Sequence, residues 1–177
     1  MSSSKRKVDI RYTNGIISAA LACFFFVHAF FGSVSLLIFL PSKLSFLVWA
    51  GVCLMAAHVA ACVVTSRRML ADTDRPPSAR KKGHLALKWI SGGLLLASAA
   101  FHVWKFEGFA SPEGDAAFLF TTLLVVGLFA CHLCIGLKSL LKDMNVDRKH
   151  RTCLRFVVCI LSILLTGMIV WRILESF

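Results

Sequence analysis

Residues 116–137 read AAFLFTTLLVVGLFACHLCIGL and contain no Lys, Arg, Asp or Glu. An α-helix needs about 20 predominantly apolar residues to cross the hydrocarbon core of a bilayer. This stretch is long enough to do so, and it carries one histidine, His132. It therefore predicts a transmembrane helix, which we expect to run over about 116–141.

The rest of the chain repeats this pattern of apolar stretches separated by short charged segments. The third stretch has the shortest uncharged window, 89–104, and Lys88 and Lys105 can lengthen it by reaching toward the headgroups. We expect an all-α membrane protein, a single domain over 1–177, with five transmembrane helices at about 14–40, 44–66, 85–107, 116–141 and 153–175.

The distribution of charge predicts how the chain lies in the membrane. The net charge is +11 and 58% of the residues are hydrophobic, but the charges are confined to a few short segments. A nucleic-acid-binding protein needs a basic face on a soluble fold, so that function class is excluded. With the amino terminus in the cytoplasm, all of the 20 Lys and Arg residues except Lys43, Lys105 and Arg172 lie on the cytoplasmic side. The positive-inside rule therefore predicts a multi-pass protein of the plasma or inner membrane with a cytoplasmic amino terminus.

Each of the first four predicted helices contains one histidine within its apolar stretch: His28, His58, His102 and His132. An ionisable side chain at membrane depth is costly, and it indicates a functional site. His58 and His132 lie nearer the cytoplasmic end of their helices, His102 lies near the outer end, and His28 is roughly central. Depth therefore pairs His58 with His132 and His28 with His102.

Two histidine pairs at two depths are typical of two bis-histidine b-type haems in a four-helix bundle, because neutral imidazole is a good axial ligand for iron. A small residue follows each histidine or precedes it by one turn (Gly32, Cys62, Ser98 and Gly136), which leaves room for a porphyrin. Ordinary hydrogen bonding between helices is the alternative for any single histidine. A zinc or non-haem iron centre would need carboxylate or thiolate ligands at the same depth. A transporter or proton relay would need Asp or Glu within the spans.

Two segments resemble motifs of a known family. Residues 99–104, AAFHVW, resemble the WHVW-type haem-ligand segment of the five-helix, two-haem cytochrome b subunit of succinate:quinone and quinol:fumarate oxidoreductases, with Phe101 in place of the first tryptophan. Residues 131–137, CHLCIGL, resemble that family's FHxxxGL segment, with Cys131 in place of the phenylalanine. In residues 87–92, LKWISG, Trp89 stands where the family's LxRxxG helix start has arginine. His28 and His58 are placed as in the family.

The resemblance implies the haem b-containing membrane anchor of a succinate dehydrogenase or fumarate reductase. Such an anchor would pass electrons between a membrane quinone, menaquinone or ubiquinone, and a cytoplasmic iron–sulfur and flavoprotein pair that carries the dicarboxylate chemistry. The family pairs its first ligand with the third and its second with the fourth, as depth does here. The alternatives are a dihaem cytochrome b of a formate dehydrogenase or hydrogenase type, and a haem-free membrane anchor or transporter.

Several further residues are candidates for the same function. Lys88, Lys138 and Lys142 lie where the anionic propionates of an inner haem would emerge. Glu107 is the acid nearest the outer ligand and a candidate for proton transfer with quinone, and Trp104 is a candidate quinone contact. An inner quinone site near Trp89 and Ser91 is also open. Arg67, Arg68 and the basic segment 80–82 would face an iron–sulfur partner.

Overall fold

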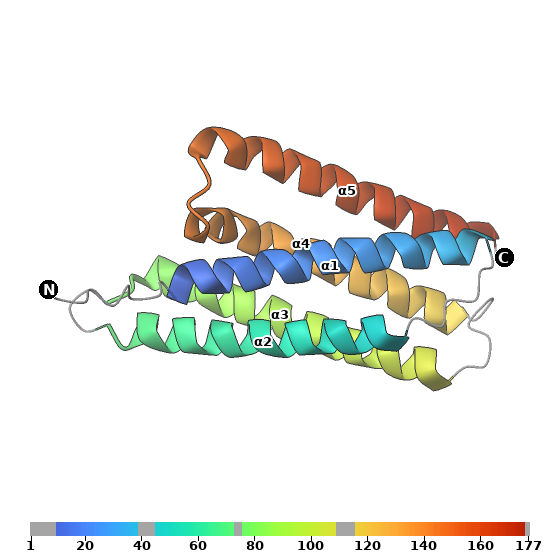
Figure 1. Ribbon diagram of the computed structural model, residues 1–177, viewed down its shortest axis with the longest axis horizontal. Helices are drawn as coiled ribbons and strands as arrows, with labels where there is room; N and C mark the ends of the chain where they lie inside the picture. Colours follow the sequence, from blue (N-terminus) through green and yellow to red (C-terminus); the bar gives the residue numbers. More distant parts are fainter. Residues whose placement is uncertain (1–9, 39–44, 73–75, 109–115, 176–177) are drawn as a thin grey trace, which may run out of the picture.

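The computed structural model of the chain describes residues 10–38, 45–72, 76–108 and 116–175. This part of the chain is helical apart from short turns. Its helices are α1 (Ile10–Ile38), α2 (Ser45–Leu70), α3 (Ala79–Gly108), α4 (Ala116–Asp143) and α5 (Arg148–Glu175) (Figure 1). All five are long and apolar enough to cross a membrane. The prediction of an all-α protein with five membrane-length helices is confirmed.

The helices extend further into the basic segments than the sequence predicts. Helix α2 continues to Leu70 instead of ending at 66, α3 begins at Ala79 instead of 85, and α5 begins at Arg148 instead of 153. Arg and Lys favour the helical state, so the charged residues that bound the apolar window do not have to end the helix. The start of α3 is set by its local sequence, because Pro76 and Pro77 disfavour a longer helix and the Ser78 hydroxyl accepts a hydrogen bond from the Lys81 backbone N–H.

The turn between α4 and α5 is closed by backbone hydrogen bonds. Asn145 adopts a positive φ of 54°, a conformation that asparagine tolerates better than most residues. The Val146 N–H donates to the Leu141 carbonyl at 3.0 Å, as in a Schellman motif, and the Arg151 guanidinium donates to the Val146 carbonyl at 2.7 Å. These bonds satisfy carbonyls at the end of α4 and fix where α5 starts.

The first four helices form a bundle with a definite cyclic order. Helix α1 packs on α2 and on α4, and α3 packs on α4. Helices α2 and α3 are linked by a hydrogen bond from the Trp89 indole N–H to the Ser66 hydroxyl. The order around the bundle is therefore α2–α1–α4–α3, which places α1 diagonally opposite α3 and α2 diagonally opposite α4.

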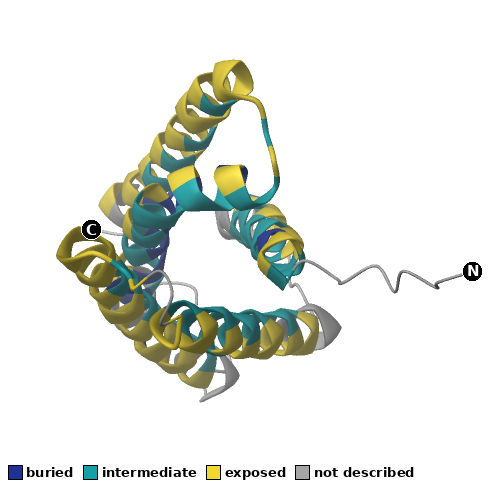
Figure 2. Ribbon diagram, turned by 90° about the vertical axis from the view of Figure 1, so that its left-hand side faces the viewer, coloured by how far each residue is buried: buried dark blue, intermediate teal, exposed yellow. Residues whose placement is uncertain are grey.

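The apolar core lies along α4, and α5 covers it from outside. Phe129, Leu133, Leu137 and Leu141 are buried in one cluster on α4, and Phe25 of α1 stacks on Phe129 with ring centroids 3.6 Å apart. Helix α5 packs on α4 and α1 and carries no histidine beyond His150 near its start. The outer helix surfaces are exposed (Figure 2), and many of the exposed side chains are large and apolar, as on a surface that faces lipid.

Candidate functional site

The four candidate histidines lie on four different helices of the bundle. His28 is on α1, His58 on α2, His102 on α3 and His132 on α4. Both pairs predicted from depth join diagonally opposite helices. His58, His102 and His132 are half-buried, whereas His28 is exposed. Helices that hold ligands on opposite sides of a shared interior suit a cofactor bound between them.

His58 is held by polar groups of α1. Its Nδ1 lies 3.0 Å from the Ser18 hydroxyl oxygen, and the same hydroxyl lies 2.7 Å from the Asn14 backbone carbonyl. The Cys62 thiol, one turn further along α2, lies 3.6 Å from His58 Nε2 and 3.7 Å from the Asn14 side-chain oxygen. The α1–α2 contact at this level is therefore a small polar cluster inside two apolar helices.

His132 has a matching environment on α3. Its Nδ1 lies 2.9 Å from the hydroxyl of buried Ser91, and this hydroxyl also bonds to the Lys88 backbone carbonyl at 3.1 Å. The imidazole ring lies against the backbone of Gly92. A Cβ atom at Gly92 would be 3.1 Å from His132 Cε1, so any side chain at this position would crowd the ring.

The outer pair is held differently. His102 Nδ1 lies 3.3 Å from the Thr122 hydroxyl of α4. His28 stacks on Phe24 of its own helix, with parallel rings whose centroids are 6.2 Å apart. Phe24 in turn lies against Gly51 of α2, where a Cβ atom would come within 2.7 Å of the Phe24 ring. The side chain that contacts the His28 ring is thus an aromatic ring, whereas the other three histidines contact a hydroxyl.

The three lysines predicted to hold propionates have different environments. Lys88 is half-buried, donates to the Ser139 hydroxyl of α4, and lies within electrostatic range of His132, Cys62 and Asp143. Lys138 and Lys142 of α4 are both exposed. Of the three, Lys88 is the one whose charge the structure brings to the inner histidine pair.

The candidate quinone residues lie at the far end of α3. Trp104 is 65% exposed and its ring is 5.4 Å from the ring of Phe101. Glu107 belongs to the last turn of α3, and its side chain is outside the described residues. The structure thus leaves both as sequence-based candidates. At the alternative quinone site near Trp89 and Ser91, the Ser91 hydroxyl contacts His132 and the Trp89 indole N–H donates to the Ser66 hydroxyl.

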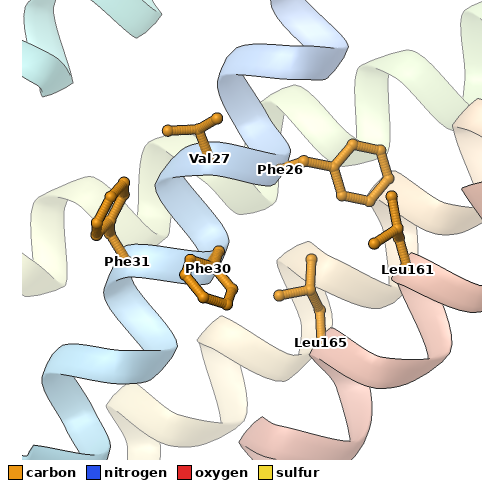
Figure 3. A pocket seen from close by; sticks show the side chains of 6 residues that line it. All are labelled: Phe26, Val27, Phe30, Phe31, Leu161 and Leu165. Carbon is orange, nitrogen blue, oxygen red and sulfur yellow. The ribbon is translucent and has the colours of Figure 1, made fainter.

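An apolar groove of about 220 Å³ runs between α1 and α5. Figure 3 shows its lining side chains, which are Phe26, Val27, Phe30, Phe31, Leu161 and Leu165. None of them can hydrogen-bond a quinone carbonyl. The groove can therefore accept hydrocarbon but offers nothing to a quinone ring.

Among the described residues, no group of three or more His, Cys, Asp and Glu side chains comes together as a metal site. A zinc or non-haem iron centre with several protein ligands has no donor set in that part of the chain. Two histidines at each level match the two axial positions of a haem iron.

Sequence reasoning did not identify Ser18 and Thr122 as partners of the histidines, and it considered Ser91 only as part of an inner quinone site. These partners could have been found by looking for a Ser or Thr within an apolar helix at the same depth as a histidine on the neighbouring helix. Comparison of the chain with protein-family models, with curated proteins and with solved structures found no match.

Proposed function

We propose that this chain is the dihaem cytochrome b membrane anchor of a succinate:quinone or quinol:fumarate oxidoreductase. The observation that carries the proposal is one histidine on each of the four bundle helices, with His28 and His102 on one diagonal pair of helices and His58 and His132 on the other. Contacts with hydroxyls of neighbouring helices involve three of the four histidines, at Ser18, Ser91 and Thr122, and His28 has no such contact among the hydrogen bonds described. Two bis-histidine haems, one at each level, account for all four.

The residues around the histidines are compatible with haem. Each inner histidine has a hydroxyl at Nδ1, so Nε2 would be the ligand atom. At His58 the iron would displace the Cys62 thiol, which lies 3.6 Å from Nε2. When bound, the haems supply one-electron transfer, and the protein sets their orientation and surroundings. The half-buried Lys88 would neutralise a propionate of the inner haem, since its ammonium group lies in the bundle near His132.

The partners follow from the proposed class. The exposed basic residues Arg67 and Arg68, together with Arg80, Lys81 and Lys82, form a positive surface at the end of the bundle nearest the inner histidine pair. A cytoplasmic iron–sulfur protein docked there would exchange electrons with the inner haem, and its flavoprotein partner would carry the succinate and fumarate chemistry. The membrane quinone would react near the outer haem, with Trp104 and Glu107 as contacts.

The test is purification of the chain, expressed in its own host, in a mild detergent. We expect two b-type haems per chain by pyridine haemochrome assay and a sharp reduced α band in the visible spectrum. Mass spectrometry of the eluate should find an iron–sulfur protein and a flavoprotein. A pure chain without haem would refute the proposal, and haem together with a molybdenum or nickel enzyme would assign the chain to a formate dehydrogenase or hydrogenase.

A further inference from the structure

We infer that Ser18 and Ser91 are positioning residues that fix the ring tautomer of His58 and His132, so that Nε2 of each ring carries the free lone pair. This inference rests on the proposed function, because the free nitrogen is the one that would bind the inner haem iron. Neither serine is on the same helix as the histidine that it holds: Ser18 reaches from α1 to α2 and Ser91 from α3 to α4.

The direction of these hydrogen bonds follows from counting protons. A serine hydroxyl has one proton to donate, and a backbone carbonyl can only accept. The Ser18 and Asn14 oxygens are 2.7 Å apart, a separation that requires a proton between them, so the Ser18 proton is committed to the carbonyl. Ser18 must then accept at its other contact, and the proton in that 3.0 Å bond belongs to His58 Nδ1. The other ring nitrogen, Nε2, lies 3.6 Å from the Cys62 thiol, which is a much weaker acceptor than the Ser18 oxygen and does not compete for the ring proton.

The same count of protons applies to His132 on α4, the helix diagonally opposite α2. The Ser91 hydroxyl donates to the Lys88 carbonyl at 3.1 Å and therefore accepts from His132 Nδ1 at 2.9 Å. A neutral imidazole carries one N–H, so with Nδ1 protonated the lone pair lies on Nε2 in both rings. Both inner ligands are thus prepared in the same state by the same device.

The contacts of the outer pair differ. The Thr122 hydroxyl lies 3.3 Å from His102 Nδ1, further than either serine oxygen lies from its histidine, and the His28 ring stacks on Phe24. Hydrogen-bonding partners of metal-bound histidines typically change metal affinity by about 10–100-fold when removed. Loss of a serine should therefore affect the inner haem selectively.

The experiment compares Ser18→Ala and Ser91→Ala with Ser162→Ala, each purified as the full chain with its partners. Ser162 is a close match for Ser18, because both are half-buried and both hydroxyls donate to a backbone carbonyl four residues earlier. Ser162 lies on α5, which carries none of the four candidate ligands. Ser18→Thr restores the hydroxyl and serves as the conservative variant.

Haem per chain is measured during competition with apomyoglobin, and the ferric low-spin signal of each haem is followed by electron paramagnetic resonance during redox titration. We expect Ser18→Ala and Ser91→Ala to release the inner haem at least about 10-fold more readily and to shift its ferric signal and midpoint potential. The outer haem, Ser162→Ala and Ser18→Thr should behave as wild type. Thermal unfolding in detergent separates this effect from a general loss of stability.

A Ser91→Ala variant that keeps both signals and both haems as Ser162→Ala does would overturn the inference while leaving the dihaem proposal intact. A change confined to the outer haem would also overturn it. If Ser91→Ala fails to accumulate, the comparison of Ser18→Ala with Ser18→Thr decides, since half-buried Ser18 tolerates either side chain. A wild-type chain without haem overturns the proposed function itself.

Discussion

Replacing Gly92 with alanine would place a methyl group against the ring of His132. The new Cβ would lie 3.1 Å from Cε1, 3.6 Å from Nδ1 and 3.9 Å from Nε2 of the imidazole. Carbon atoms in comfortable contact are about 3.5–4.0 Å apart, so the ring must retreat by roughly 0.4 Å. Its 2.9 Å bond to Ser91 restricts that movement, because Ser91 is buried on the same turn of α3.

The neighbouring Gly93 provides the control. A Cβ at Gly93 would meet no atom within 4 Å, and this position is exposed. Alanine in place of a helical glycine stabilises by about 0.5–1 kcal/mol, and both variants receive this gain. Only Gly92→Ala bears the cost of overpacking, about 1–3 kcal/mol. The helix contribution cancels between the two variants, and Gly92→Ala should therefore be less stable than Gly93→Ala by about 1–3 kcal/mol.

The assay is reversible unfolding of the two variants in mixed micelles of mild detergent and dodecyl sulfate, followed by circular dichroism. Haem per chain is measured on the same samples, and the larger substitution Gly92→Leu should remove the inner haem where Gly93→Leu does not. Equal unfolding free energies for the two alanine variants would show that the His132 ring does not lie against Gly92. The reasoning about the inner site would then be wrong.

Three further predictions concern the proposed function. Replacing His58 or His132 with alanine should remove the inner haem, and replacing His28 or His102 should remove the outer haem. Redox titration measures this, with exposed His84 and His150 as control positions. Four variants that all keep two haems would refute the assignment. Charge reversal of the basic segment 80–82 should lower the yield of intact complex in pull-down experiments at low salt, and the difference from wild type should shrink at higher salt because salt screens exposed charges; an unchanged yield at low salt would argue against docking there. Glu107→Gln should slow quinol-linked turnover while both haems and the artificial-donor rate are retained; if both rates are unchanged, Glu107 has no part in proton transfer.

The helices, and the helix that carries each histidine, were predictable from the sequence because both depend on position along the helix axis. The length of an uncharged window predicts a span, and the distance of a histidine from the flanking charges predicts its depth. The helix ends were less predictable, since the start of α3 contains the three consecutive basic residues 80–82 and is still helical. Outside the hydrocarbon layer, charge does not disfavour a helix.

The side-chain partners were not predictable because they depend on the rotation of each helix about its own axis. Lys88, Lys138 and Lys142 are equivalent in the sequence as basic residues near the inner end of a span. Only the packing of α3 on α4 turns Lys88 toward Ser139 and leaves the other two exposed. Ser18 likewise becomes a partner of His58 only through the rotational setting of α1 against α2.

The cyclic order of the bundle bears on how such a protein would assemble. Its first four helices form two hairpins, α1–α2 and α3–α4, each closely packed within itself. Each hairpin contributes one histidine to each level, so neither could bind a haem with both axial ligands alone. Under the proposed function, each haem would link the two hairpins through its two axial ligands. Haem insertion would then be a late step of biogenesis that joins two hairpins already formed. In cells that lack haem, the chain should then accumulate with both hairpins inserted in the membrane but not linked to each other. We expect membrane proteases to cleave this form in the connection between α2 and α3.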